Sequence, residues 1–100
     1  MSANAKTEKI TTLREETRET KDALYTYTLT VRTGDSVASF GLPLYSVWIN
    51  MTDKDGNHTE ASLEDIFSDS KSAFRFFDKL IRNLATPIDL PYVLEDEIHC

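Results

Sequence analysis

The chain has 100 residues, 40% of them hydrophobic and 28% charged, and its formal net charge at pH 7 is −6. Residues 1–22 carry five Lys/Arg and five Asp/Glu, whereas residues 23–100 carry six and twelve, so the part expected to fold is the acidic part. This charge disfavours nucleic acids and anionic membranes as partners, and the length predicts one domain whose modest core would gain from self-association.

The first 22 residues form a polar segment that two interpretations fit. Ile10 and Leu13 are too sparse for the buried side of a helix, whereas the many threonines favour an extended edge strand. That strand would form a hairpin with residues 25–31 through a turn at residues 19–23. Partial disorder is the alternative. We expect residues 23–100 to form a single domain in either case.

Three strands are predicted next. In residues 25–31 large apolar side chains alternate with threonines, which is typical of a half-buried strand. A loop over residues 33–41 leads to a second strand at residues 44–51. Asp55-Gly56 suits a hairpin turn, and a short third strand is expected near residues 58–61. Alternation places one set of residues on the face away from the core, namely Leu44, Ser46, Trp48, Asn50, Thr26, Thr28 and Thr30.

Two helices are predicted after the strands. The first begins at a cap chosen among residues 68–70 and ends near residue 84 or 85, because Pro87 disfavours helical geometry at the residue before it. Its apolar stripe consists of Ala73, Phe74, Phe77, Leu80, Ile81 and Leu84. We expect Phe77 and Ile81 to be buried against the sheet. Asp89 should cap the second helix by accepting from the N–H groups of residues 91 or 92.

These elements predict an α+β domain. It would contain a three- or four-stranded antiparallel sheet, one long helix packed on one face of that sheet, and a short C-terminal helix at an edge.

Three segments of the chain carry a resemblance to a known family. They are LPLYSVWINM, LEDIFSD and FFDKLIRNLATPIDLPYVLEDEI, and the most specific part runs from Asn83 to Leu90. Over residues 24–98 the chain resembles small proteins of clostridia and related Firmicutes that share a domain of unknown function. The resemblance implies a cytoplasmic bacterial protein, and it implies no substrate, cofactor or catalytic residue.

Four residues are candidates for a protein interface. Trp48, with Leu44 beside it, would project from a face that is otherwise mostly polar, and large aromatic side chains are enriched at binding hot spots. A covering N-terminal segment, or simple partial exposure, is the competing explanation for Trp48. Glu95 and Asp96 belong to an acidic run. Its favoured interpretation is a solvated helix surface, and the alternative is an acidic patch that binds a basic partner.

No catalytic, cofactor or metal site is readable. Asp53, Asp55, Asn57, Thr59 and Glu64 echo the ligand spacing of a calcium loop, but His58 stands where that loop needs glycine. His99 and Cys100 supply only two of the four ligands that a structural zinc site takes.

We therefore expect a non-enzymatic cytoplasmic domain that acts through protein contacts, with an unknown protein or with a second copy as a homodimer. No apolar run is long enough for a membrane span, and no signal-peptide core is present. A small-ligand or metal-binding regulator is the alternative, and an enzyme ranks third.

Overall fold

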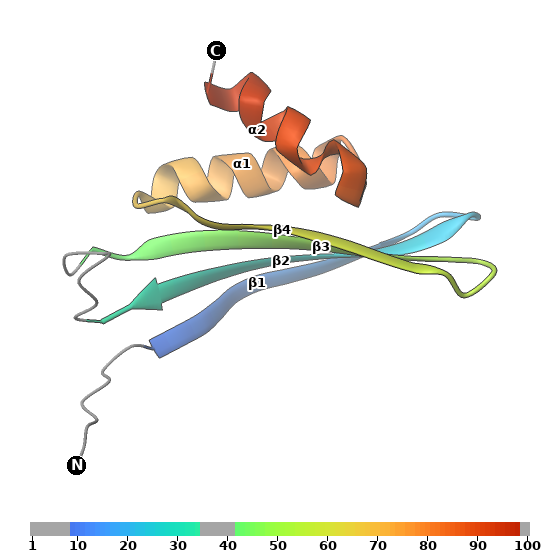
Figure 1. The fold of residues 1–100 in the computed structure, drawn as a ribbon, viewed down its shortest axis with the longest axis horizontal. Helices are drawn as coiled ribbons and strands as arrows, with labels where there is room; N and C mark the ends of the chain where they lie inside the picture. The colour runs from blue at the N-terminus through green and yellow to red at the C-terminus, as the bar shows by residue number, and fades with distance from the viewer. Residues whose placement is uncertain (1–8, 35–41, 99–100) are drawn as a thin grey trace.

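The protein folds as an antiparallel sheet with two helices on one side (Figure 1). The computed structural model describes residues 9–34 and 42–98, and the side chains of these residues up to 95. The strands are β1 (Lys9–Glu19), β2 (Ala23–Thr33), β3 (Leu44–Asp53) and β4 (His58–Phe67). They lie in the order β1-β2-β3-β4. The α+β class is confirmed, and the sheet has four strands rather than three.

The register of the strands divides their side chains between two faces. Val47 of β3 lies opposite Leu29 of β2 and Leu63 of β4, and all three point toward the helices. We call this side the helix face. The opposite side, here called the second face, carries Thr26, Thr28, Thr30 and Arg32 of β2, Leu44, Ser46, Trp48 and Asn50 of β3, and the residues of β1 and β4 paired with them.

The two helices are short. Helix α1 (Ser70–Arg82) has 13 residues, so the expectation of one long helix holds only loosely, and α2 (Leu90–Ile98) has 9. Asp69 caps α1, as its Oδ2 accepts from the Ser72 N–H at 2.8 Å, and hydrogen bonds from Ser72 lower the pKa of this carboxyl. Helix α1 ends in a Schellman arrangement in which Leu84, at φ 49°, occupies the left-handed position that glycine usually takes.

A short 3₁₀ turn, η1 (Pro87–Asp89), joins the helices, and it corrects the capping prediction for Asp89. The Asp89 Oδ2 accepts from the N–H of Thr86 at 3.0 Å, and the Thr86 hydroxyl accepts from the N–H of Asp89 at 3.3 Å. This pair is a capping box for η1. Pro91 has no N–H to offer, so the predicted bond toward residues 91 or 92 was partly ruled out by the sequence itself.

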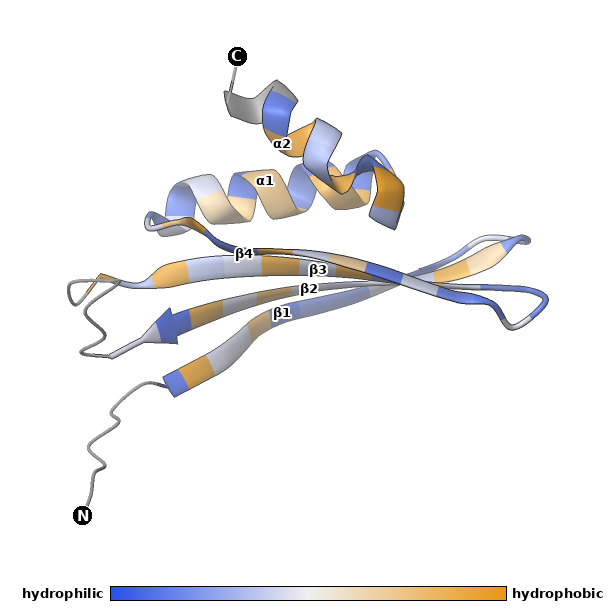
Figure 2. Cartoon of the chain, in the orientation of Figure 1, coloured by the Kyte–Doolittle hydropathy of each residue, from blue (hydrophilic) through white to orange (hydrophobic). Residues whose placement is uncertain are grey.

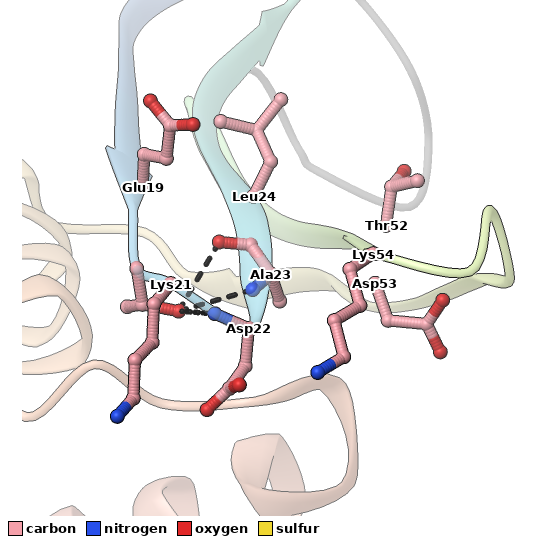
Figure 3. A pocket seen from close by; sticks show the side chains of 9 residues that line it. Glu19, Lys21, Asp22, Ala23, Leu24, Thr52, Asp53 and Lys54 are labelled. Atoms are coloured by element: carbon pink, nitrogen blue, oxygen red, sulfur yellow. Dashed lines mark hydrogen bonds between the residues drawn. The ribbon is translucent and has the colours of Figure 1, made fainter.

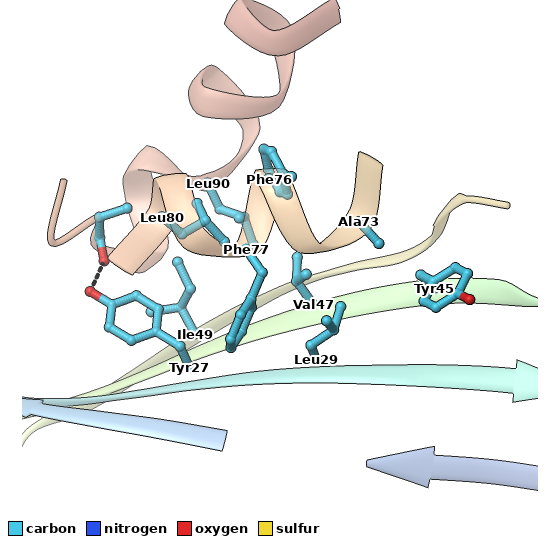
Figure 4. Packing of buried hydrophobic residues seen from close by; sticks show 11 residues of the cluster. Tyr27, Leu29, Tyr45, Val47, Ile49, Ala73, Phe76, Phe77, Leu80 and Leu90 are labelled. Carbon is cyan, nitrogen blue, oxygen red and sulfur yellow. Dashed lines mark hydrogen bonds between the residues drawn. The ribbon is translucent and has the colours of Figure 1, made fainter. Parts of the chain in front are cut away.

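The core lies between α1, η1 and the helix face of the sheet (Figure 4). Phe77 and Phe76 are both 0% exposed, whereas Ile81 is only partly buried. The prediction for Phe77 is therefore confirmed, and the one for Ile81 holds only in part, because its side chain packs against the core but stays partly exposed. Phe76 was left out of the predicted stripe, yet it packs 5.6 Å from the Phe67 ring at the end of β4. Helix α1 lies against β2, β3 and β4, and Phe76 adds its contact with Phe67 to the predicted stripe.

The polar segment at the start of the chain supplies the edge strand β1, in which hydrophilic residues predominate after Leu13 (Figure 2). A bulge between Thr12 and Arg14 shifts the register, so that Arg14 faces the helices. Its guanidinium lies 5.3 Å from the Phe77 ring centre and 3.1 Å from a carboxylate oxygen of Asp78. A second ion pair, with Glu16 at 3.0 Å, lowers the pKa of that carboxyl. Charged groups thus hold β1 to the helix layer where apolar residues are lacking.

Candidate interaction surface

Short hydroxyl side chains surround a single tryptophan on the second face. Trp48 lies directly opposite Thr28 of β2 and Ser62 of β4. Its side chain is partly buried, as is that of Leu44 further along the same strand. Among the described residues, no helix or strand covers this face (Figure 1). The structure therefore puts Trp48 and Leu44 on the predicted side of the sheet, and their role in an interface stays a prediction.

Beside Trp48 the sheet is distorted by a bulge in β4. Leu63 pairs with Val47 and Phe67 with Tyr45, which leaves three β4 residues opposite Ser46 alone. The middle one, Asp65, has φ 56°, in the left-handed region that costs most non-glycine residues about 1–2 kcal/mol. Its N–H donates to the Ser46 hydroxyl at 2.8 Å, so the turn is held by β3.

The bulge aims the carboxylate of Asp65 across the second face. Its Oδ2 accepts a hydrogen bond from Nη2 of Arg32 at 2.6 Å, which joins β4 to β2 over the intervening strand. Both side chains are about one-third exposed, at 28% for Arg32 and 34% for Asp65. Sequence reasoning missed this pair. The Glu64-Asp65 dipeptide followed by Ile66 and Phe67 breaks strand alternation, and that break was the available signal.

A notch of about 120 Å³ opens between these groups. Two of its residues, Thr30 at 8% and Ser46 at 5% exposed, are buried although they lie on the face without helices. Larger neighbours cover them, since a sheet face lined by hydroxyls alone would leave them accessible. The residues that line the notch are Ile10, Thr30, Arg32, Ser46, Trp48, Glu64 and Asp65.

The charge of the second face is negative on both sides of its central strands. Glu15 and Glu19 project from β1, and Glu60 and Glu64 project from β4. All four are exposed. The one arginine of this face is paired with Asp65, so it does not offset the four carboxylates. An approaching partner therefore meets acidic edges around a strip of hydroxyls and Trp48.

The surface of the described residues has two other depressions, and their polar groups are mostly occupied by hydrogen bonds within turns and caps. One, of about 300 Å³, lies where the β1–β2 and β3–β4 turns meet (Figure 3). Its polar groups serve the turns: the Thr20 hydroxyl bonds to Asp22 and Ala23, and the Lys54 N–H donates to the Asp22 carbonyl at 3.1 Å. The other, of about 260 Å³, lies at the helix corner against Lys79, Asn83, Ala85, Asp89, Tyr92 and Val93.

The acidic candidates Glu95 and Asp96 lie on α2, on the opposite side of the sheet from Trp48 (Figure 1). Glu95 is exposed, and the side chain of Asp96 lies outside the described residues. The fold therefore does not bring the two groups of candidates together. Any interface that used both would have to wrap around an edge of the sheet.

The suspected calcium loop is a hairpin turn, with Gly56 at φ 88°. Asp53 accepts from the N–H groups of Asp55 and Asn57, both at 2.9 Å, and these bonds, chiefly the one from Asn57, lower its pKa. Its carboxylate thus organises the turn. In the described part of the chain no three His, Cys, Asp or Glu side chains converge as metal ligands, and His99 and Cys100 lie outside that part.

One alignment on the second face has the order of a catalytic triad. Nδ1 of His58 lies 3.3 Å from the Thr52 hydroxyl, and its Nε2 lies 3.2 Å from a carboxylate oxygen of Glu60. The side chains of His58 and Glu60 are 53% and 64% exposed, and Thr52 is an exposed residue at the depression of about 300 Å³ between the turns. Hydrolytic triads work in a site that excludes water, whereas these three residues are open to solvent.

No helix among the described residues is long and apolar enough to cross a membrane.

The candidate site is a polar sheet face with acidic edges and one aromatic residue, on a small α+β domain. Residues 6–99 match the model of a family of unknown function, DUF6514, and the chain belongs to that family. No curated protein and no solved structure matches the chain.

Proposed function

We propose that this protein is a non-enzymatic interaction module that binds another protein through the second face of its sheet, with Trp48 at the centre of the contact. One observation carries the proposal. The helix-face core is complete without Trp48, since Tyr27, Leu29, Val47 and Ile49 are all 0% exposed under α1. A partly exposed tryptophan on the other face is therefore not needed for the core. Exposed aromatic residues ringed by polar ones are typical of binding hot spots.

Membership in a family of unknown function leaves the setting open, and we place the protein in the bacterial cytoplasm. Support for this comes from the LPLYSVWINM, LEDIFSD and FFDKLIRNLATPIDLPYVLEDEI segments, which resemble those of proteins from clostridia and related Firmicutes. The partner we propose is another protein, and a homodimer is the competing assembly. Nucleic acids and membranes are disfavoured by the four carboxylates on the second face and by the net charge of −6.

A small-ligand regulator is the second candidate, and the hollow at the helix corner favours it. That hollow of about 260 Å³ combines Tyr92 and Val93 with polar groups of Lys79, Asn83 and Asp89. It falls just below the usual range of about 300–1,000 Å³ for ligand pockets. Asp89 already serves the capping box there, which leaves fewer groups to orient a ligand. The second face therefore ranks first.

The experiment compares Trp48→Ala with a matched aromatic control, Tyr92→Ala. Tyr92 is 67% exposed on α2, so its loss changes another surface of the same protein. Association is measured by analytical ultracentrifugation and by pull-down on the parent and both variants. We expect Trp48→Ala to weaken association by roughly 2 kcal/mol, about 30-fold in Kd, and Tyr92→Ala to leave it unchanged.

The proposed function is wrong if Trp48→Ala associates as tightly as the parent does. It is also wrong if the variant loses association only because it unfolds, which circular dichroism on the same sample would reveal. An effect of Tyr92→Ala alone would move the contact to the helix corner.

A further inference from the structure

We infer that the notch beside Trp48 receives an arginine or lysine side chain of a basic partner protein. This deepens the proposed function and rests on it, because it names the chemistry that the second face recognises. The notch offers the three groups that bind such a side chain: an aromatic ring, carboxylates and the hydroxyl groups of largely buried residues.

The first support is the composition of the notch. Trp48 supplies the best aromatic surface for a cation, and Glu64 and Asp65 supply carboxylates within the same depression of about 120 Å³. Thr30 and Ser46 are largely buried residues that add hydroxyl groups, of which the Ser46 oxygen already accepts from the Asp65 N–H. The volume of the notch gives room for a group larger than a single water molecule.

The second support is the balance of charge. Asp65 is neutralised by Arg32, but Glu64 makes no ion pair with a described residue. Glu15, Glu19 and Glu60 flank the same face. Arg32 also lines the notch, but its guanidinium is paired with Asp65, so an anionic ligand would compete with that carboxylate, whereas a cation placed beside Glu64 would gain an ion pair. Desolvation by Trp48 and Ile10 would strengthen that attraction relative to open water.

The third support is the backbone of β4. Asp65 is held in the left-handed region by its bond to Ser46, and such conformations persist only where the surroundings fix them. In a strand with regular alternation Glu64 would lie on the second face at this point and Asp65 on the helix face, so the bulge adds Asp65 as a second carboxylate beside the notch. The bulge interrupts the regular pairing of β4 with β3 and directs the Asp65 carboxylate across the second face.

The charge also decides between a different protein and a second copy. Two copies stacked through their second faces would bring Glu15, Glu19, Glu60 and Glu64 of one chain against those of the other. The facing carboxylates of two copies would repel each other, whereas a basic partner would be attracted to them. We therefore assign the cation to a different protein.

Trp48 is the only tryptophan of the chain, so its fluorescence reports directly on the notch. The probe is a hexa-arginine peptide, and hexaglutamate serves as the anionic counterpart. We expect hexa-arginine to change the emission of Trp48 in a saturable, salt-sensitive way and hexaglutamate to leave it unchanged. Glu64→Gln should weaken the binding at least tenfold.

The matched control is Glu95→Gln, which removes the same charge from the exposed α2 surface. It should change Kd for hexa-arginine less than twofold. Equal weakening by Glu64→Gln and Glu95→Gln would mean that the peptide senses only net charge, and that result overturns the inference. Asp65→Asn, which keeps a residue tolerant of positive φ, tests the second carboxylate and should weaken binding as well.

The same variants separate this inference from the proposed function. If Trp48→Ala loses the protein partner while Glu64→Gln retains it at parental affinity, the interaction module stands and the cation site is wrong. If neither variant affects association, both are wrong. A dimer whose dissociation constant rises in Glu64→Gln would place the cation on a second copy, and would overturn the assignment to a different protein.

Discussion

The two faces of one sheet are built from the same strands and differ in almost every respect. On the helix face, side chains such as Leu29 and Ile49 are fully buried under Phe77 and Leu80. On the second face, the buried residues among those that the structure describes are Thr30 and Ser46, and both are polar. Burial of apolar area stabilises a fold, whereas buried hydroxyls contribute little beyond their hydrogen bonds. The stability of the domain therefore resides on one face, which leaves the other free to vary in chemistry.

Each edge strand carries a bulge, and the two bulges serve opposite faces. The bulge in β1 directs Arg14 toward the Phe77 ring and Asp78 on the helix face. The bulge in β4 directs Asp65 toward Arg32 on the second face. The β1 bulge adds one residue and so reverses the side that the following side chains take, whereas the β4 bulge adds two, so that Leu63 and Phe67 stay on the same face and only the residues between them are redirected. Edge strands can thus serve either face without a change in sheet order.

The sharpest test of the comparison is Phe77→Ala against Trp48→Ala. Removing the fully buried Phe77 ring should lower the free energy of unfolding by about 3–5 kcal/mol, because it leaves a cavity under α1. Trp48→Ala should cost much less, since its ring is partly exposed. Thermal and urea melts of both variants measure this. Ile81→Ala, a partly buried position of the same helix, is the control and should fall between them. If Phe77→Ala and Trp48→Ala lowered the free energy of unfolding equally, the claim that the helix face supplies most of the stability would be wrong.

Tyr27→Phe tests the one polar contact within the helix-face core. The Tyr27 hydroxyl donates to the Ala85 carbonyl at 2.8 Å, and burial raises the pKa of Tyr27 to about 12 (Figure 4). Losing this bond should cost about 1–2 kcal/mol, because a buried carbonyl is left without its donor.

The pH dependence of the same variant follows from the raised pKa. The native state holds the phenolic proton more tightly than the unfolded chain, whose tyrosines titrate near pH 10. This contribution is fully present below about pH 10 and is lost as the pH rises toward 12. Urea melts between pH 9 and pH 12 should show a shallower alkaline decline for Tyr27→Phe than for the parent. Parallel declines would contradict the burial of that hydroxyl.

The smallest expected effect concerns the corner that positions α2. Asp89→Ala should cost about 1 kcal/mol, since it removes the carboxylate that accepts from the Thr86 N–H. Thr86→Val should cost a similar amount, and the double variant less than the sum, because both changes break one capping box. Strict additivity in urea melts would show that the two residues act separately.

Much of the fold followed from local patterns. Alternation located β2 and β3 and divided their faces correctly, because strand periodicity depends only on neighbouring residues. The Asp55-Gly56 turn was recognised for the same reason, and the cap of α1 was narrowed to residues 68–70, among which Asp69 is the one that caps. The burial of Phe76 was missed, because the direction in which a helix rolls on a sheet depends on tertiary packing against Phe67.

The candidate surface was only half predictable. Trp48 and Leu44 could be assigned to a face from β3 alone, whereas the notch combines residues of all four strands. Its key pair, Arg32 and Asp65, depends on a bulge whose local signal is the break in alternation at Glu64-Asp65, and that break does not reveal which residue of β2 the carboxylate meets. The predicted third strand near residues 58–61 proved longer, reaching Phe67.

The strand order β1-β2-β3-β4 repeats the order of the chain, and this has a kinetic consequence. Each strand forms by folding back on the one synthesised just before it, so no pairing waits for a distant segment to arrive. Loop-closure entropy is small for such neighbours, and folding is correspondingly fast for a sheet protein, on the order of milliseconds. A half-made sheet would then expose its long edges only briefly, which limits the time in which two nascent chains can join.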